Sequence, residues 1–470
     1  MTQNKSKTAL MWFKNDLRLL DNESLIKAIE YSDAILPVYI FDPRHYEETE
    51  INEPKSGFNR FQFLIQTLAD LKNNLESKGG KLLLKVGKPE KIIPELVSEH
   101  NITAVFTEEE YAPEECKVIN AVAGNLEKSC DFIRTWGKTL YHIDDLPYSI
   151  PEIPLTSKAF RINTEKQASV RKVINEPEKI NVITLKSWGE FPSASAFNLT
   201  QQNEPKEQPY LKGGETEALD RLQYYTKESE LLTSYKWTRN RSLGLDYSSK
   251  LSPYLALGAI SPRKIYEVVK QYEKDIKKNI STWWLIFEVV WRDYFTFKGM
   301  RMGNQIFSTA GFKNKEISFE NDSKKFERWC AGTTGIPFID AHMRQLNETG
   351  YMSNRGRVNC ASYFVHDLKI DWTWGAAYFE SKLIDYDVSS NWMNWHMQAY
   401  EIWYTNPVHQ SLKYKAAEFI QKWIPELSNV ESALIYAPWK MTEAPSGYPE
   451  PIEVYSKWSR SINNIVKAAE

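Results

Sequence analysis

The sequence has few cysteines and no long apolar run. The four cysteines lie far apart and form no CxxC pair: Cys116, Cys130, Cys330 and Cys360. This spacing argues against a zinc site or an all-cysteine iron–sulfur cluster, and we predict no metal site. No stretch approaches the roughly eighteen apolar residues of a membrane-spanning helix, and the first residues show no signal peptide. We therefore expect a cytoplasmic protein with no membrane segment.

Net charge is also nearly absent, since 59 basic residues oppose 61 acidic ones and leave −2. A nucleic-acid partner would therefore need a local basic patch. No GxGxxG occupies the first expected strand–helix turn, which disfavours NAD binding. Aromatic residues are instead abundant, with 16 Trp and 25 Tyr, and a large aromatic core accounts for most of them.

The first third of the chain alternates strand and helix patterns. Apolar runs at 8–13 and 34–42 predict buried strands, and residues 60–80 form an amphipathic helix pattern that stops at two glycines. Asp21 stands where it would cap a helix over NESLIKAIEY. Three more strand patterns follow: KLLLKVG, ITAVFTEE and DFIRTW. This alternation predicts an α/β domain with a doubly wound parallel sheet over residues 1–145.

The composition changes twice after this domain. Between 146 and 214, Pro, Ser, Thr, Asn, Lys and Gln dominate, and we expect a connector wrapped over the surface. From 215 to 470, apolar residues recur at helical spacing, which predicts an all-α domain. The length of 470 residues fits such a multidomain chain.

Three segments of the helical part combine polar and aromatic residues. In SSKLSPYLALGAISP, the serines 248, 249 and 252 lead into a helix that opens near Pro253. This helix start is either a phosphate site or an ordinary serine cap. In WWLIFEVVWRDYF, Glu288 and Arg292 share a helix face. They form either an exposed ion pair or part of a buried site in which the carboxylate needs a partner or ligand.

The third segment is DYDVSSNWMNWHMQ, residues 385–398. Its Asn391 stands among aromatics and must find hydrogen bonds, while Asp385 and Asp387 have Arg357 as a candidate partner. Trp372 and Trp395 either carry electrons to a buried redox cofactor or simply pack. Together the three segments indicate a polar, aromatic cavity that holds a cofactor with phosphates.

Several motifs in one order resemble the photolyase/cryptochrome family, and the DASH cryptochrome branch most closely. They are LMWFKNDLRLLDNESL, DYSSKLSPYLALGAISPR, FEVVWRDYF, TGIPFIDAHMRQLNETGYMSNRGR and LIDYDVSSNW. The resemblance implies an N-terminal antenna domain and a C-terminal domain that holds FAD. It assigns FAD contacts to the following residues: Tyr235, Ser248, Ser249, Lys250, Leu251, Ser252, Glu288, Arg292, Arg357, Asp385, Asp387 and Asn391.

The resemblance also implies an activity, that of a deoxyribodipyrimidine photolyase, which is a carbon–carbon lyase. Reduced flavin donates an electron under blue light and splits a cyclobutane pyrimidine dimer, mainly in single-stranded or looped DNA. Asn391 would face flavin N5, Glu288 and Asn354 would hydrogen-bond the lesion, and Trp291 would pack against it. Trp395 and Trp372 would carry electrons.

The remaining implied features concern partners. A basic rim for DNA would comprise Lys236, Arg239, Arg241 and Arg355. A methenyltetrahydrofolate antenna would meet Glu114 and Glu115, and the protein would act as a monomer.

The sequence departs from the family pattern in three ways. Phe319 stands at the outer position of the tryptophan electron chain. The glycine-rich stretch expected after Trp395 is replaced by HMQAYEIWYTNP and is shorter by about seven residues. Met397 and Val358 stand where relatives often have an aromatic and a polar residue near the lesion. The alternative function is therefore a blue-light photoreceptor of the same fold with reduced or lost repair.

Overall fold

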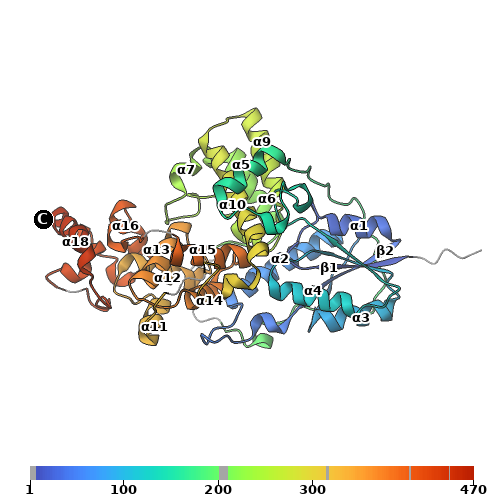
Figure 1. Cartoon of the computed structure of the whole chain (residues 1–470), viewed down its shortest axis with the longest axis horizontal. Coiled ribbons are helices and arrows are strands. Elements are labelled where there is room, and N and C mark those ends of the chain that lie inside the picture. The colour runs from blue at the N-terminus through green and yellow to red at the C-terminus, as the bar shows by residue number, and fades with distance from the viewer. Residues whose placement is uncertain (1–6, 201–209, 314–316, 402–403, 444) are drawn as a thin grey trace, which may run out of the picture.

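A computed structural model describes residues 7–200, 210–313, 317–401, 404–443 and 445–470 (Figure 1). An α/β unit lies at one end of the molecule and a helical unit extends to the other, where α18 (Ser459–Ala469) lies. The α/β-plus-helical architecture predicted from the sequence is confirmed. None of the described helices is long and apolar enough to cross a bilayer.

The α/β unit contains five parallel strands in the order β3-β2-β1-β4-β5. The strands are β1 (Thr8–Phe13), β2 (Ala34–Phe41), β3 (Leu83–Val86), β4 (Ala104–Glu108) and β5 (Asp131–Thr135). The helices between them are α1 (Glu23–Tyr31), α2 (Phe58–Ser77), α3 (Pro89–His100) and α4 (Pro113–Asn125). Alternate residues of β1 enter two separate cores, one on each face of the sheet. This explains why the strands read as continuous apolar runs.

Asp21 does not cap α1, so this prediction was wrong. Asn22 is the N-cap, and its side chain accepts a hydrogen bond from the amide of Leu25 at 3.0 Å. Asp21 is fully buried with a positive φ of 60°. Its carboxylate accepts hydrogen bonds from the Ser261 hydroxyl and, at 2.8 Å, from Arg263 Nε, both in the helical unit. A side chain of the first loop therefore fastens the two units together.

Two more buried carboxylates join the units. Glu215 accepts hydrogen bonds from the amides of Leu19 and Leu20 at 2.8 and 2.9 Å. Asp293 accepts hydrogen bonds from the amides of Leu140 and Tyr141, both at 2.9 Å. Burial raises the pKa of each carboxyl to about 7. The α/β unit and the helical unit are thus held by specific hydrogen bonds as well as by apolar packing.

Residues 146–214 contain α5 (Ser157–Gln167), a helix in the expected connector. Its Phe160 is fully buried in the core of the helical unit, as is Ile153 just before it. This segment also packs on the α/β unit through the buried Ile180, Phe197 and Leu199, while most of its length is polar. The domain boundaries near 145 and 214 remain a prediction.

The all-α character predicted for the helical unit is confirmed by its α-helices. They are α6 (Glu215–Gln223), α7 (Tyr235–Thr238), α8 (Ser252–Ala256), α9 (Pro262–Asp275), α10 (Ile280–Met302), α11 (Ser323–Ala331), α12 (Pro337–Thr349), α13 (Asn354–His366), α14 (Trp372–Lys382), α15 (Val388–Tyr400), α16 (Pro407–Lys413), α17 (Ala417–Trp423) and α18. The longest, α10, is apolar on most sides because it crosses the core beside α15 and α9.

Candidate cofactor-binding site

A cavity of about 620 Å³ lies in the helical unit. Its wall includes every residue that the resemblance assigned to FAD, together with Trp291, Asn354, Arg239, Trp395, Val358 and Met397. These residues come from α7, α8, α10, α13, α15 and the segment before α8. Segments more than a hundred residues apart in the chain therefore converge on one polar and aromatic cavity, as the sequence predicted.

One wall carries a buried ion pair. Arg357 Nη2 lies 2.8 Å from Asp385 Oδ2, and Arg357 Nε donates to the Met352 carbonyl at 2.9 Å. The hydroxyl of Ser252 donates to the same carboxylate at 2.6 Å. Asp385 is buried, so these contacts fix its orientation and keep its charge compensated. Ser252, at the start of the five-residue helix α8, thus helps to orient the Asp385 carboxylate.

A second acid, Asp387, caps the helix that forms the opposite wall. Its Oδ1 accepts a hydrogen bond from the amide of Ser390 at 2.8 Å at the start of α15. Its Oδ2 accepts one from the hydroxyl of Tyr111 at 3.0 Å and lies 3.6 Å from Arg292. Tyr111 belongs to the α/β unit, so that unit reaches the cavity wall. No sequence pattern indicated that Tyr111 would contact Asp387.

Asn391 is buried one turn further along α15 and faces the cavity. Its Nδ2 donates to the carbonyl of Ala376 at 2.9 Å. The amide nitrogen is thereby occupied, and the amide oxygen is left as the acceptor available to a ligand. A group that carries a proton on nitrogen would complete the hydrogen bonding of this side chain.

Glu288 does not form the i,i+4 ion pair with Arg292. Its Oε1 accepts hydrogen bonds from Trp284 Nε1 at 2.9 Å and from Arg239 Nη1 at 2.6 Å. Burial raises the pKa of Glu288, and Arg239 opposes that shift. Arg292 instead donates to the carbonyl of Lys138 and lies near Asp387. Glu288 is therefore a positioned acid at the cavity wall rather than a solvated surface charge.

Lys250 is the least satisfied charge of the cavity wall. It is 2% exposed, has a φ of 61°, and its Nζ has no hydrogen-bond partner within the described residues. The ammonium lies 3.4 Å from the ring centre of Tyr247 and 4.4 Å from that of Tyr351. Burial lowers the pKa of Lys250 well below its usual value, and Arg221 and Arg357 add to this effect. Its Nζ has almost no accessible surface, so an anionic ligand group in the cavity would act on it through charge rather than through a direct hydrogen bond.

The two predicted electron carriers are both buried. Trp395 lies in the cavity wall and packs edge-on against Phe379 at 5.1 Å. Trp372 lies outside the cavity, 6.0 Å from the rings of Trp392 and His396, and donates to the Thr309 carbonyl at 3.1 Å. The hydroxyl of Tyr400 donates to the same carbonyl. A tyrosine therefore lies beside Trp372, the carrier expected next to the outer position that Phe319 occupies.

The predicted basic rim is largely engaged. Arg239 pairs with Glu288, and Arg355 Nη2 donates to Asn240 at 2.9 Å. Lys236 lies over two indole rings, whereas Arg241 is exposed. Their role toward DNA remains a prediction.

The predicted antenna acids differ from each other. Glu114 is exposed and pairs with Lys55. Burial, and next Glu110, raise the pKa of Glu115 to about 7. A folate antenna at these residues remains a prediction.

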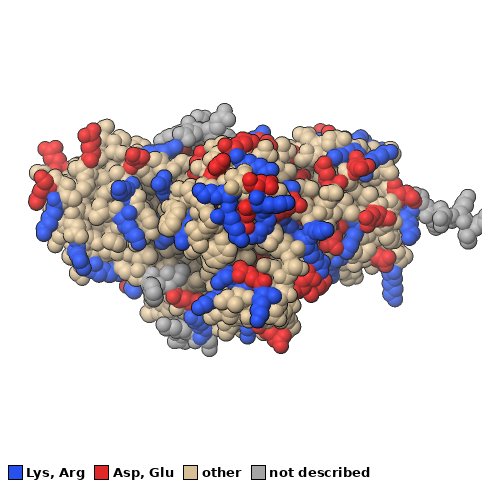
Figure 2. All heavy atoms as spheres, turned by 90° about the horizontal axis from the view of Figure 1, so that it is seen from above, with Lys and Arg blue, Asp and Glu red and all other residues tan. Residues whose placement is uncertain are grey.

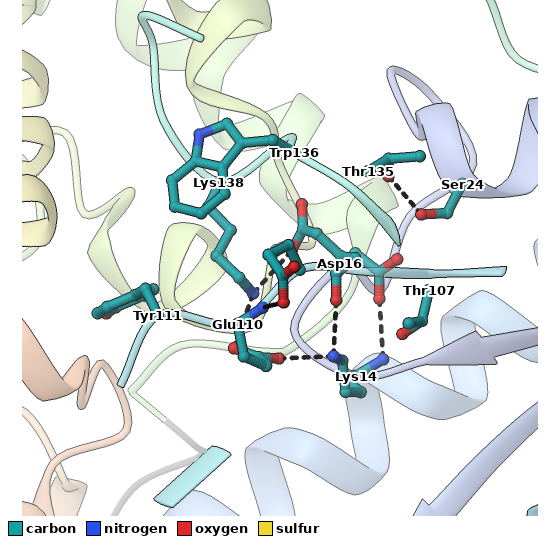
Figure 3. Close-up of polar contacts among 12 residues, drawn as sticks. Lys14, Asp16, Ser24, Thr107, Glu110, Tyr111, Thr135, Trp136 and Lys138 are labelled. Carbon is teal, nitrogen blue, oxygen red and sulfur yellow. Dashed lines mark hydrogen bonds and ion pairs between the residues drawn. The ribbon is translucent and has the colours of Figure 1, made fainter. Parts of the chain in front are cut away.

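A second polar cluster lies at the carboxyl edge of the sheet (Figure 3). This sheet-edge cluster comprises Lys14, Asp16, Glu108, Glu110 and Lys138. Lys138 Nζ lies 2.8 Å from Glu108 and 3.3 Å from Glu110, and Lys14 Nζ lies 2.9 Å from Glu110. The backbone amide of Lys14 donates to Asp16 at 2.8 Å. Opposite charges thus neutralise one another where open α/β sheets commonly bind a ligand.

Comparison with known proteins matches both units. The profile described as DNA photolyase matches residues 9–178, and that of the FAD binding domain of DNA photolyase matches 284–468. Cryptochrome DASH of Xenopus laevis is 42% identical, over 97% of this chain and 92% of the relative. The crystal structure of a Synechocystis cryptochrome superposes with a TM-score of 0.91 at 38% identity, over 98% of this chain and 99% of that one. An archaeal photolyase from Sulfolobus tokodaii with two FAD molecules superposes with a TM-score of 0.79 at 29% identity, over 98% and 99%.

The cavity fits flavin adenine dinucleotide. Its volume of about 620 Å³ lies within the ordinary range of ligand pockets. Ser248, Ser249 and Arg292 line the wall and offer polar groups to a diphosphate. Asn391 offers an acceptor to a ring N–H, and several aromatic side chains line the wall. FAD is the cofactor of this domain.

Proposed function

Because the chain belongs to the photolyase/cryptochrome family, we propose that it is a DASH-type photolyase. Its substrate is a cyclobutane pyrimidine dimer, chiefly in single-stranded DNA. The observation that carries the proposal is one shared cavity: the groups fitted to FAD and the groups fitted to a lesion line the same wall. When bound and reduced, FAD supplies the electron that opens the dimer under blue light.

The residues of this chain orient and protect that chemistry. The pair of Arg357 and Asp385 places a fixed cation and a fixed anion at the cofactor. The amide of Asn391 would hydrogen-bond flavin N5, since its oxygen and its second N–H are not used by the bond to the Ala376 carbonyl. Asp385 and Asn391 are buried, which limits the access of water to the reacting centre.

Three residues are proposed to receive the lesion. Trp284 and Arg239 both donate to Oε1 of Glu288, which leaves Oε2 to accept a hydrogen bond from a base N–H. Asn354 is exposed at the start of α13 and lines the cavity. Trp291 packs against Phe295 at 5.4 Å and offers an aromatic face. Flipping the lesion out costs a few kcal/mol in duplex DNA and less in a single strand, which favours the latter substrate.

A blue-light photoreceptor is the second candidate, and one observation favours it. Met397 and Val358 line the cavity and add apolar, non-aromatic surface near the lesion groups. Loss of a stacking partner costs about 1–3 kcal/mol per base. Repair therefore depends on the contacts of Glu288, Asn354 and Trp291.

The test measures splitting of a defined thymine dimer by chemically reduced holoprotein, in a single strand and in duplex. We expect splitting in blue light and none in darkness, with the single strand faster. Glu288→Ala should lower the rate about tenfold or more, because a hydrogen bond to a charged group contributes about 1.5–3 kcal/mol. Glu267→Ala, at an exposed ion pair on α9, is the matched control and should leave the rate unchanged. An unchanged dimer count with reduced protein would refute repair and leave the photoreceptor function.

A further inference from the structure

Trp237 is the most exposed large apolar side chain of the described residues, at 68%. It belongs to the short helix α7, whose first residue, Tyr235, is buried and lines the cavity. An indole held outward on a helix whose neighbouring residue is anchored gains nothing from the core. Its large apolar face is available to a partner.

Basic and aromatic side chains alternate between Trp237 and the cavity. Lys236 Nζ lies 4.9 Å from the ring centre of Trp237 and 4.9 Å from that of Trp284. The guanidinium of Arg239 lies 5.1 Å from the ring of Trp284, which lines the cavity. We call Trp237, Lys236, Trp284 and Arg239 the aromatic–cation row. It runs from the surface to the wall that carries Glu288.

We propose that Trp237 stacks on a base of single-stranded DNA that neighbours the nucleotide in the cavity. Single-strand sites combine cations that follow the phosphates with aromatic faces that stack on bases, and the aromatic–cation row has both. This proposal rests on the proposed function and extends it, because it assigns binding of the strand outside the cavity to a specific residue. Stacking is independent of sequence, so the flanking base is free to vary.

The charges of the row select a nucleic acid over a protein partner. Arg239 is paired with Glu288, the acid in contact with the row, so the cations left for a partner are Lys236 and the exposed Arg241, which follows the row in the chain. The face in Figure 2 mixes acidic and basic side chains and shows no continuous basic band. Phosphate attraction is therefore local, and stacking must supply part of the affinity.

The test measures binding of unmodified oligothymidylate of about 12 nucleotides by fluorescence anisotropy, in darkness, with the holoprotein. Trp237→Ala should weaken binding about tenfold, equal to about 1.4 kcal/mol. Trp237→Phe keeps an aromatic face and should stay within about twofold of the wild type. A strand of the same length with abasic sites should bind the wild type and Trp237→Ala equally, because no base remains to stack.

Trp188 provides the matched control. It is a half-buried tryptophan of the 146–214 segment that packs against the α/β unit, with Lys81 5.7 Å from its ring. Trp188→Ala should leave oligothymidylate binding unchanged, after circular dichroism has shown it folded. Equal losses for Trp237→Ala on the thymidylate and abasic strands, or no loss on either, would overturn the stacking role. Because the assay uses neither light nor a lesion, a failure of dimer splitting does not affect its outcome.

Discussion

Two buried lysines occupy opposite kinds of polar site. Lys138, in the sheet-edge cluster, lies between Glu108 and Glu110, and these acids, against the effect of burial, raise its pKa. Lys250, in the cavity wall, has a ring of tyrosines and no hydrogen-bond partner in the described part of the chain, and its pKa is lowered. Both side chains are nearly inaccessible to solvent, at 7% and 2%. The protein supplies ion-pair partners for the first lysine, whereas the described residues supply no hydrogen-bond partner for the second.

The difference shows how a common ligand position is replaced. In open α/β sheets, ligands bind at the carboxyl edge where strand order reverses, which is between β1 and β4 here. The sheet-edge cluster places mutually paired charges at that position, so its charged groups need no ligand as a partner. In the helical unit, by contrast, Lys250 of the cavity wall has a buried amine with no hydrogen-bond partner among the described residues.

The largest expected effect comes from breaking the sheet-edge cluster. Lys138→Met leaves Glu108 and Glu110 buried with less compensation, and loss of one partner of a buried ion pair costs about 3–5 kcal/mol. We expect the free energy of unfolding, measured with urea by circular dichroism, to fall by about 3 kcal/mol. The affinity of the variant for FAD should equal that of the wild type. A stability equal to the wild type would mean that the cluster is held by solvent rather than by its own charges.

A smaller effect should appear in the pH dependence. Burial, and next Glu108, raise the pKa of Asp16 to about 6. The folded state therefore keeps a proton that the unfolded chain releases near pH 4, so this contribution to stability is full at low pH and is lost as pH rises from about 4 to 6. We expect a loss of about 2 kcal/mol over that interval from this carboxyl. Asp16→Asn should reduce the slope, and about 0.5 M salt should preserve it because the group is buried. An unchanged slope in the variant would contradict this assignment.

The smallest expected effect sharpens the comparison, because it applies the same substitution to the other lysine. Lys250→Met removes an unpaired buried amine, so the stability of the FAD-free protein should stay equal or rise. Affinity for FAD should fall about tenfold, since a positive charge that attracts the diphosphate is lost. Equilibrium dialysis measures the affinity, and urea unfolding measures the stability. Lower stability with unchanged FAD affinity would make Lys250 a structural residue.

Much of this architecture is predictable from local patterns. The strands are continuous apolar runs because each is buried on both faces, and the helices show apolar periodicity. The residues that the resemblance to the photolyase/cryptochrome family assigned to FAD all line one cavity.

Contacts between distant segments were not predictable. Tyr111 reaches Asp387 from another unit, and Tyr351 approaches Lys250 from about a hundred residues away. Glu288 pairs with Arg239 rather than with Arg292, its neighbour along the helix. Spacing along one helix reveals only which side chains share a face, whereas partners from other elements depend on tertiary packing.

The hydrogen bond from Arg263 to Asp21 cannot form until late in synthesis. The two residues are 242 positions apart, and Asp21 is fully buried once they meet. At about 5–20 residues per second, a ribosome needs roughly ten to fifty seconds to add the intervening chain. During that interval only the amide of Ile174 can donate to the Asp21 carboxylate, because Ser261 and Arg263 do not yet exist. The loop after the first strand is therefore completed only when a helix translated much later has been made.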